Sequence, residues 1–183
     1  MRAGRIVAAG LAVTALLAVS ACGSTAAPGT SAAGATTKFY PAGSRSAAPV
    51  VTGSLLGGGT FALSAQHGHV VVVNFWESYC APCRVEAADL ESLSQSSGAV
   101  FIGVNVNDDQ DKATAYEQAH KITYPSIFDP GGRVMLAFSG LPMTSVPSTI
   151  VIDPDGKVAA IHLDSVSSAE LSAMIDSATG EKA

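Results

Sequence analysis

A continuous apolar run ends just before a pair of cysteines, and this junction constrains the fold more than any other feature of the chain. Residues 70–75 read Val-Val-Val-Val-Asn-Phe, which has the length and β-branched content of a central strand covered on both faces. Cys80 and Cys83 follow, and from Pro82 to about Gly98 the apolar residues recur with helical spacing. Pro82 suits the first turn of a helix, because a proline has no N–H to lose there. The cysteines are therefore expected where a buried strand gives way to a helix.

The rest of the C-terminal part continues the pattern of strands and helices. Strands are expected at 99–106 and in a hairpin of 149–152 and 157–163, with short extended pieces at 61–63 and 124–128. Helices are expected at 110–120 and 134–138, and a capping box at residues 167–170 opens a last helix through residue 178. This order predicts an α/β protein, a three-layer α/β/α sandwich with a mixed central sheet.

The first 21 residues have the organisation of a signal peptide. Two arginines precede an apolar stretch from Ile6 to Val19, which is too short for a stable membrane helix of ~20 residues. Residues 19–22 read Val-Ser-Ala-Cys and resemble the bacterial lipobox, in which cleavage precedes the cysteine and a diacylglycerol is attached to its sulfur. We expect residues 1–21 to be removed and Cys22 to be lipidated, which places the protein on the outer face of the cytoplasmic membrane. Ordinary secretion and an uncleaved anchor are the alternatives.

Between residues 22 and 59 the composition changes to Ala, Gly, Ser, Thr and Pro. Lys38 and Arg45 carry the only charges of this stretch. A stretch with so little apolar volume to bury cannot offset the entropy cost of becoming ordered. Residues 22–59 are therefore predicted to form a flexible, lipidated tether. The folded domain is then expected at 60–183, where about 120 residues are enough for one core.

Charge and cysteine count exclude several classes of protein. The net charge is −5, with 15 acidic and 10 basic residues, and a nucleic-acid binder would instead present a basic stripe to phosphates. A hydrophobic content of 48% excludes a disordered chain. Three cysteines are too few for a disulfide scaffold, and lipidation of Cys22 would account for the odd one.

The spacing of Cys80 and Cys83 points to thiol chemistry. A cysteine at a helix N-terminus meets unpaired N–H groups and the positive end of the helix dipole, which favour its thiolate. Cys80 is therefore expected to be the nucleophile, and Cys83, one turn further in, the resolving thiol of a redox-active disulfide. A zinc half-site completed by His67 and His69, or a purely structural disulfide, remain alternatives. Haem attachment is disfavoured because Arg84 stands where a histidine would be needed. No cofactor or metal is expected.

Residues 76–83 resemble the Trp-x-x-x-Cys-x-Pro-Cys signature of thioredoxin-like proteins, and further motifs resemble the extracytoplasmic TlpA/ResA branch of thiol:disulfide oxidoreductases. Glu86 completes that branch's Cys-x-Pro-Cys-x-x-Glu pattern, residues 105–130 resemble its extra segment, and residues 146–157 resemble its cis-proline loop and hairpin. The chain departs from the pattern at Tyr79, Ala88 and Ser148, where the branch often has Trp or His, Pro, and Thr.

The resemblance implies roles for individual residues. Glu86 would be a partly buried carboxylate that accepts the proton of Cys83. A cis Val146–Pro147 bond would expose the backbone of Val146 to an extended substrate peptide, and Trp76 would pack beside the disulfide and help to shape the docking surface.

The resemblance also implies a reductant of exported proteins, for example of the haem-site cysteines of apocytochrome c in cytochrome c maturation, recharged by a membrane electron donor of the CcdA/DsbD type. The same cysteines could instead act as an oxidant that forms disulfides, because direction depends on the reduction potential. A peroxiredoxin-like peroxidase is a further alternative, although no Pro-x-x-x-Thr-x-x-Cys pattern surrounds Cys80. The last alternative is a non-enzymatic protein that carries a metal ion.

Overall fold

The computed structural model describes residues 36–143 and 145–180, and the predictions for the signal peptide and for Cys22 lie outside these residues. The strands are β1 (Thr36–Phe39), β2 (Thr52–Ser54), β3 (Thr60–Ala62), β4 (Val71–Trp76), β5 (Val100–Val106), β6 (Ser126–Asp129), β7 (Ser148–Ile152) and β8 (Val158–Leu163). The α-helices are α1 (Ala81–Ser96), α2 (Gln110–His120), α3 (Arg133–Ala137) and α4 (Ser168–Ala178). Among these helices, none has the length and apolarity needed to cross a membrane.

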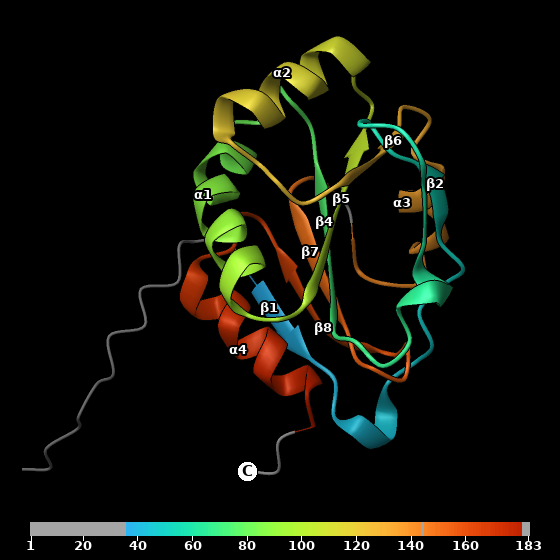
Figure 1. The fold of residues 1–183 in the computed structure, drawn as a ribbon. Coiled ribbons are helices and arrows are strands. Elements are labelled where there is room, and N and C mark those ends of the chain that lie inside the picture. The colour runs from blue at the N-terminus through green and yellow to red at the C-terminus, as the bar shows by residue number, and fades with distance from the viewer. Residues whose placement is uncertain (1–35, 144, 181–183) are drawn as a thin grey trace, which may run out of the picture. The chain divides into compact units, whose positions relative to one another are not determined.

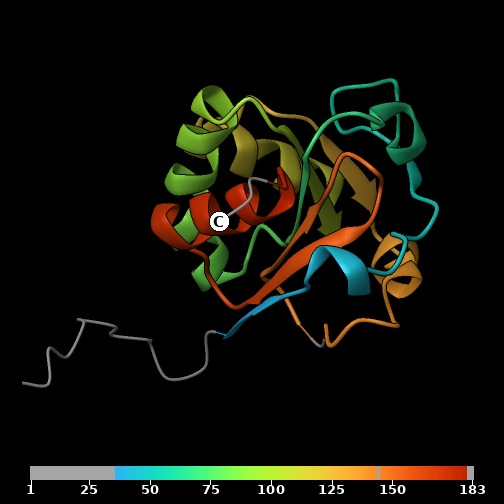
Figure 2. The same ribbon diagram turned by 90° about the horizontal axis from the view of Figure 1, so that it is seen from below.

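Six strands form one mixed sheet in the order β1-β8-β7-β4-β5-β6. The pairs β4–β5 and β5–β6 are parallel, whereas β1, β8, β7 and β4 pair antiparallel. Helices α1, α2 and α4 cover one face, and α3 with the β2–β3 hairpin covers the other (Figures 1 and 2). The predicted α/β/α sandwich with a mixed sheet is therefore confirmed.

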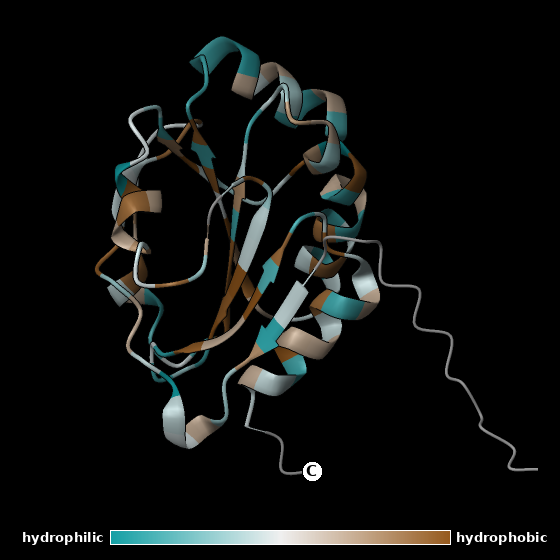
Figure 3. Cartoon of the chain, turned by 180° about the vertical axis from the view of Figure 1, so that it is seen from behind, coloured by the Kyte–Doolittle hydropathy of each residue, from teal (hydrophilic) through white to brown (hydrophobic). Residues whose placement is uncertain are grey.

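Alternate residues of the central strand β4 feed two separate cores. Val71, Val73 and Phe75 pack with residues of α3 and β3 on one face. Val72 packs on the other face with Leu90 of α1 and with apolar residues of α4. Figure 3 shows the result: the hydrophobic colour is concentrated on the sheet, and the helices carry polar residues as well. Burial of both faces explains why β4 reads as an unbroken apolar run.

The prediction of a flexible tether is wrong for residues 36–59. β1 pairs antiparallel with β8 and closes one edge of the sheet. Arg45 forms an ion pair of 2.9 Å with Asp153, and its guanidinium also donates to the carbonyl oxygen of Ser177. Val51 is buried in the core beneath α3. Backbone pairing, one charge pair and a few buried apolar side chains such as Val51 are enough to order this stretch, and composition therefore gave the wrong domain boundary.

Candidate active site

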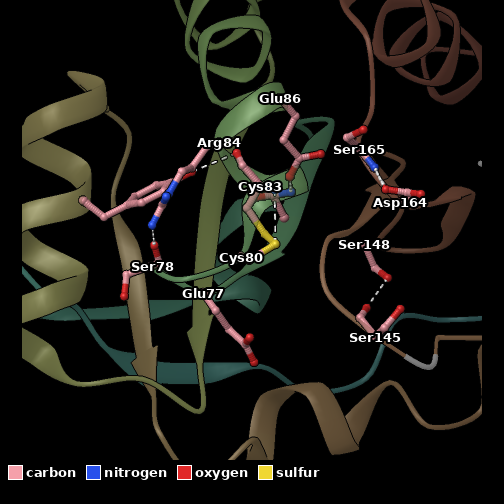
Figure 4. The surroundings of a disulfide bond; sticks show 12 residues. Glu77, Ser78, Cys80, Cys83, Arg84, Glu86, Ser145, Ser148, Asp164 and Ser165 are labelled. Carbon is pink, nitrogen blue, oxygen red and sulfur yellow. Dashed lines mark hydrogen bonds between the residues drawn. A yellow bond between two sulfur atoms is a disulfide. The ribbon is translucent and has the colours of Figure 1, made fainter.

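Cys80 and Cys83 form a disulfide at the start of α1, directly beyond the end of β4 (Figure 4). Cys80 is the N-cap residue, and its sulfur accepts a hydrogen bond of 3.2 Å from the backbone N–H of Cys83. The exposed fraction is 9% for Cys80 and 1% for Cys83. An incoming sulfur can thus reach Cys80 more readily than Cys83. Donation from an unpaired helix N–H stabilises a thiolate at this position when the disulfide is reduced.

The loop between β4 and the cysteines is held by polar contacts that the sequence reasoning missed. Asp108 accepts hydrogen bonds from the backbone N–H and from the hydroxyl of Ser78, at 2.6 and 2.9 Å. These contacts and the hydrogen bond from Asn105 hold the pKa of Asp108 below its usual value, although burial opposes this effect. Arg84 donates to the carbonyl oxygen of Ser78 at 2.9 Å. The sequence did contain a signal for the contact between Asp108 and Ser78. Asp108 follows β5 and Ser78 follows β4, and the loops after two neighbouring parallel strands lie at the same edge of a sheet.

Trp76 lies beneath the disulfide rather than on the surface. Its ring stacks on Tyr116 of α2 with centroids 4.5 Å apart, and the Tyr116 hydroxyl donates to the carbonyl oxygen of Cys83 at 2.8 Å. The indole N–H donates to Ser126 at 3.3 Å. A Cβ atom at Gly103 would lie 2.7 Å from the indole nitrogen and would also collide with the Ser126 hydroxyl, so only glycine fits there. Trp76 packs against both cysteines and so supports the disulfide. Because Trp76 is buried, it presents almost no surface to a substrate.

Glu86 lies one helical turn after Cys83 and is 1% exposed. Its carboxylate accepts two hydrogen bonds, from the side-chain amide of Asn74 at 2.8 Å and from the backbone N–H of Val166 at 3.0 Å. Both bonds lower the pKa, but desolvation is larger and, with a smaller contribution from the charge of Asp164, raises the pKa of Glu86 to about 8. A carboxyl group with such a pKa can take up and release a proton near neutral pH.

Asn74 is the second functional residue that the sequence reasoning missed. Its amide group donates to Glu86 and also to the hydroxyl of Thr149 at 3.1 Å, so both of its hydrogens are used. The signal was present, because Asn74 is the one polar residue in the apolar run of β4. A buried amide on a central strand needs partners, and one of them here is the buried carboxylate.

The Val146–Pro147 peptide bond is cis, as the resemblance implies. Val146 packs against the cluster that contains Trp76 and both cysteines, so the loop lies beside the disulfide. The carbonyl oxygen of Pro147 accepts a hydrogen bond of 3.1 Å from the backbone N–H of Asp164, which ties the loop to the end of β8.

The comparisons with known proteins agree with this geometry. A family model described as the AhpC/TSA family matches residues 45–161. The chain belongs to the AhpC/TSA family. Its match begins before residue 60, as do strands β1 and β2 of the structure.

Several proteins similar in sequence to this AhpC/TSA chain are named for thiol and disulfide chemistry. The thiol:disulfide interchange protein HelX of Rhodobacter capsulatus is 37% identical over 92 residues, which are 50% of each chain. Thiol-disulfide oxidoreductase ResA of Halalkalibacterium halodurans is 29% identical over 110 residues, 58% of this chain and 61% of ResA. The chain thus spans about half to three fifths of the length of these curated relatives. The crystal structure of a DsbF homologue from Corynebacterium diphtheriae superposes with a TM-score of 0.73 and 33% identity, covering 83% of this chain and 96% of that one.

The zinc alternative for this AhpC/TSA chain is wrong in its choice of ligands. His67 and His69 precede β4, whereas Cys80 and Cys83 follow it. Six strand residues separate the two ends by roughly 20 Å. Within residues 36–143 and 145–180, no group of three or more His, Cys, Asp or Glu side chains is placed to hold a metal ion.

Proposed function

We propose that this chain is an extracytoplasmic thiol:disulfide oxidoreductase that works through Cys80 and Cys83. The observation that carries the proposal is the pairing of an accessible sulfur at a helix N-terminus with a buried carboxyl group of raised pKa one turn beyond the inner cysteine. A purely structural disulfide would have no use for Glu86, whose burial as a charge is costly. The names of HelX and ResA support the same chemistry.

In the proposed reaction, the thiolate of Cys80 attacks a disulfide of an exported protein. One substrate sulfur leaves as a thiolate and takes up a proton, and a mixed disulfide joins Cys80 to the other. Glu86 in its ionised form accepts the proton of the Cys83 thiol, and the resulting thiolate attacks the Cys80 sulfur. The Cys80–substrate bond breaks, the Cys80–Cys83 disulfide forms, and Glu86 passes its proton to the departing sulfur. The substrate gains two electrons from the pair of cysteines and two protons, one from the Cys83 thiol through Glu86 and one from solvent, to which the Cys80 thiol had released its proton on ionising.

The cis-proline loop is the proposed substrate-binding element. The backbone of Val146 would pair with an extended segment of the substrate next to the reactive sulfur, as in β-strand addition. Pro147 has no N–H, so the backbone of Val146 is the part of the loop that can pair. Trp76 would contribute indirectly, by supporting the loop and the disulfide.

The proposal also covers the direction of electron transfer and the place where the protein acts. We place the protein as a reductant of exported proteins, including those of cytochrome c maturation, with a CcdA/DsbD-type membrane protein as its electron donor. The sequence of residues 1–22 supports export and a lipid on Cys22, which would hold the protein at the outer face of the membrane.

A turnover assay tests the proposal. The full chain with Cys22→Ser, which leaves only the two site thiols, should reduce insulin with dithiothreitol as electron source, and Cys80→Ser should abolish this activity. Cys83→Ser should instead accumulate a mixed disulfide, visible as a mass adduct. Equilibration with glutathione gives the reduction potential, and a strongly negative value supports the reductant. Peroxide consumption without insulin reduction would favour the peroxidase alternative.

A further inference from the structure

One peptide group connects the buried carboxylate of Glu86 to the buried side chain of His162 on β8. The N–H of the Ser165–Val166 peptide belongs to Val166 and donates to Glu86 at 3.0 Å. The carbonyl oxygen of the same peptide belongs to Ser165 and contacts Nε2 of His162 at 3.2 Å. Figure 4 shows this turn beside Glu86, with Asp164 and Ser165 labelled. The Glu86 carboxylate and the His162 imidazole thus contact opposite ends, the N–H and the carbonyl oxygen, of one peptide group.

The partners of His162 determine its tautomer. A carbonyl oxygen can only accept, so Nε2 carries the hydrogen and donates to Ser165. In the neutral ring Nδ1 is then an acceptor, and the Thr37 hydroxyl lies 2.7 Å away to fill it. His162 is fully buried on β8, so neither nitrogen has water as a substitute partner.

Thr37 belongs to β1, the strand that closes the sheet edge. It pairs directly with His162 across the antiparallel β1–β8 ladder. The ring is therefore held from the outer side by β1 and from the inner side by the turn after β8. Without the Thr37 hydroxyl, Nδ1 would be a buried acceptor lacking a donor, which favours reorientation of the ring.

We propose that His162, held by Thr37, is a positioning residue: it fixes the Ser165–Val166 peptide so that the Val166 N–H stays directed at the Glu86 carboxylate during proton transfer from Cys83. This inference rests on the proposed function, because it assigns a partner to the same proton acceptor. His162 touches neither the cysteines nor a substrate in this scheme and acts only through the peptide.

Other titratable groups lie near Glu86 and near His162, the two side chains that this peptide group joins. Toward Glu86 they are Asp164 from the turn after β8, Tyr116 from α2 and Tyr124 from the segment before β6. Toward His162 the charged neighbour is Glu170 of α4. None of them is altered by a substitution at Thr37, which carries no charge.

Carboxyl-carbon NMR of the oxidised protein tests the inference without using activity. The Glu86 signal is assigned by its loss in Glu86→Gln, and its titration midpoint is then compared among variants. His162→Leu should raise the midpoint by about 0.5 to 1 pH unit, since a less well-directed N–H stabilises the carboxylate less. Thr37→Val should shift it in the same direction by a smaller amount, and Thr37→Ser, which keeps the hydroxyl, should restore the original value.

Thr36→Val is the matched control, because Thr36 lies on the same strand with an exposed side chain. It should leave the Glu86 midpoint unchanged. Folded His162→Leu and Thr37→Val proteins with an unchanged midpoint would overturn the inference while leaving the proposed function intact. Should His162→Leu fail to fold, the comparison of Thr37→Val with Thr37→Ser still decides. Absence of insulin reduction by the wild-type chain would instead defeat the proposed function, whatever the titration shows.

Discussion

Burial of Glu86 should make the stability of the oxidised protein fall as the pH rises toward 8. The pKa of this carboxyl group is about 8 in the folded protein, against 4.5 for the unperturbed group. Between these values the folded state binds a proton that the unfolded state has lost, so stability decreases with increasing pH. The slope approaches about 1.4 kcal/mol per pH unit, and the whole difference corresponds to roughly 5 kcal/mol.

The measurement is the free energy of unfolding in urea at pH values from 5 to 8, for the wild type and for Glu86→Gln. Gln cannot titrate, so the difference between the two proteins isolates the contribution of this carboxyl group. We expect the wild type to lose stability relative to Glu86→Gln over this range. Buffers and ionic strength are matched, so that the other titrating groups cancel in the difference.

Glu91→Gln provides the contrasting control. Burial raises the pKa of Glu91, but hydrogen bonds donated by Thr123 and Gln95 outweigh it and lower the pKa below the usual value. Its stabilising effect is present above the unfolded pKa and is lost only as the pH falls through the folded value, so its difference from wild type should be flat between pH 5 and 8. A flat difference for Glu86→Gln as well would refute the argument that desolvation controls Glu86.

Three further predictions follow from contacts around the site and the sheet edge. Asn74→Ala removes a donor to the Glu86 carboxylate and should raise the pKa of Glu86 further, measured as an upward shift of its carboxyl-carbon NMR midpoint. Gly103→Ala should cost about 1 to 3 kcal/mol, because the new methyl group collides with Trp76 and Ser126; Trp76 is the single tryptophan, so its fluorescence reports the displacement as well as the unfolding. Arg45→Ala leaves Asp153 without its cation and should lower the free energy of unfolding by about 1 to 3 kcal/mol, whereas an unchanged value would mean that residues 36–59 do not stabilise the domain.

The sequence was most informative where local chemistry determines structure. The helix after the cysteines, the helix at 110–120 and the capping box of Ser167 and Glu170 could all be predicted, because their signals lie within a few residues of one another. The proximity of Cys83 and Glu86 could be predicted for the same reason, since they lie one turn apart on α1.

The remaining features depend on contacts between distant parts of the chain. Val166 reaches Glu86 across 80 positions of sequence, and Thr37 reaches His162 across 125. No periodicity or composition encodes such pairs, because they exist only after the sheet has assembled. β1 was missed for a related reason: its four residues enter the sheet through backbone hydrogen bonds, which any residue except proline can form.

The position of β1 also determines whether β8 is exposed as an edge strand. β8 reads Val-Ala-Ala-Ile-His-Leu and has no charged residue, and its outer side is covered by β1 alone in the sheet order. A chain shortened to begin at residue 60 would present β8 as a bare, apolar edge strand, which is a template for pairing with another copy. β1, which reads Thr-Thr-Lys-Phe, thus shields β8 from edge-to-edge pairing with another copy.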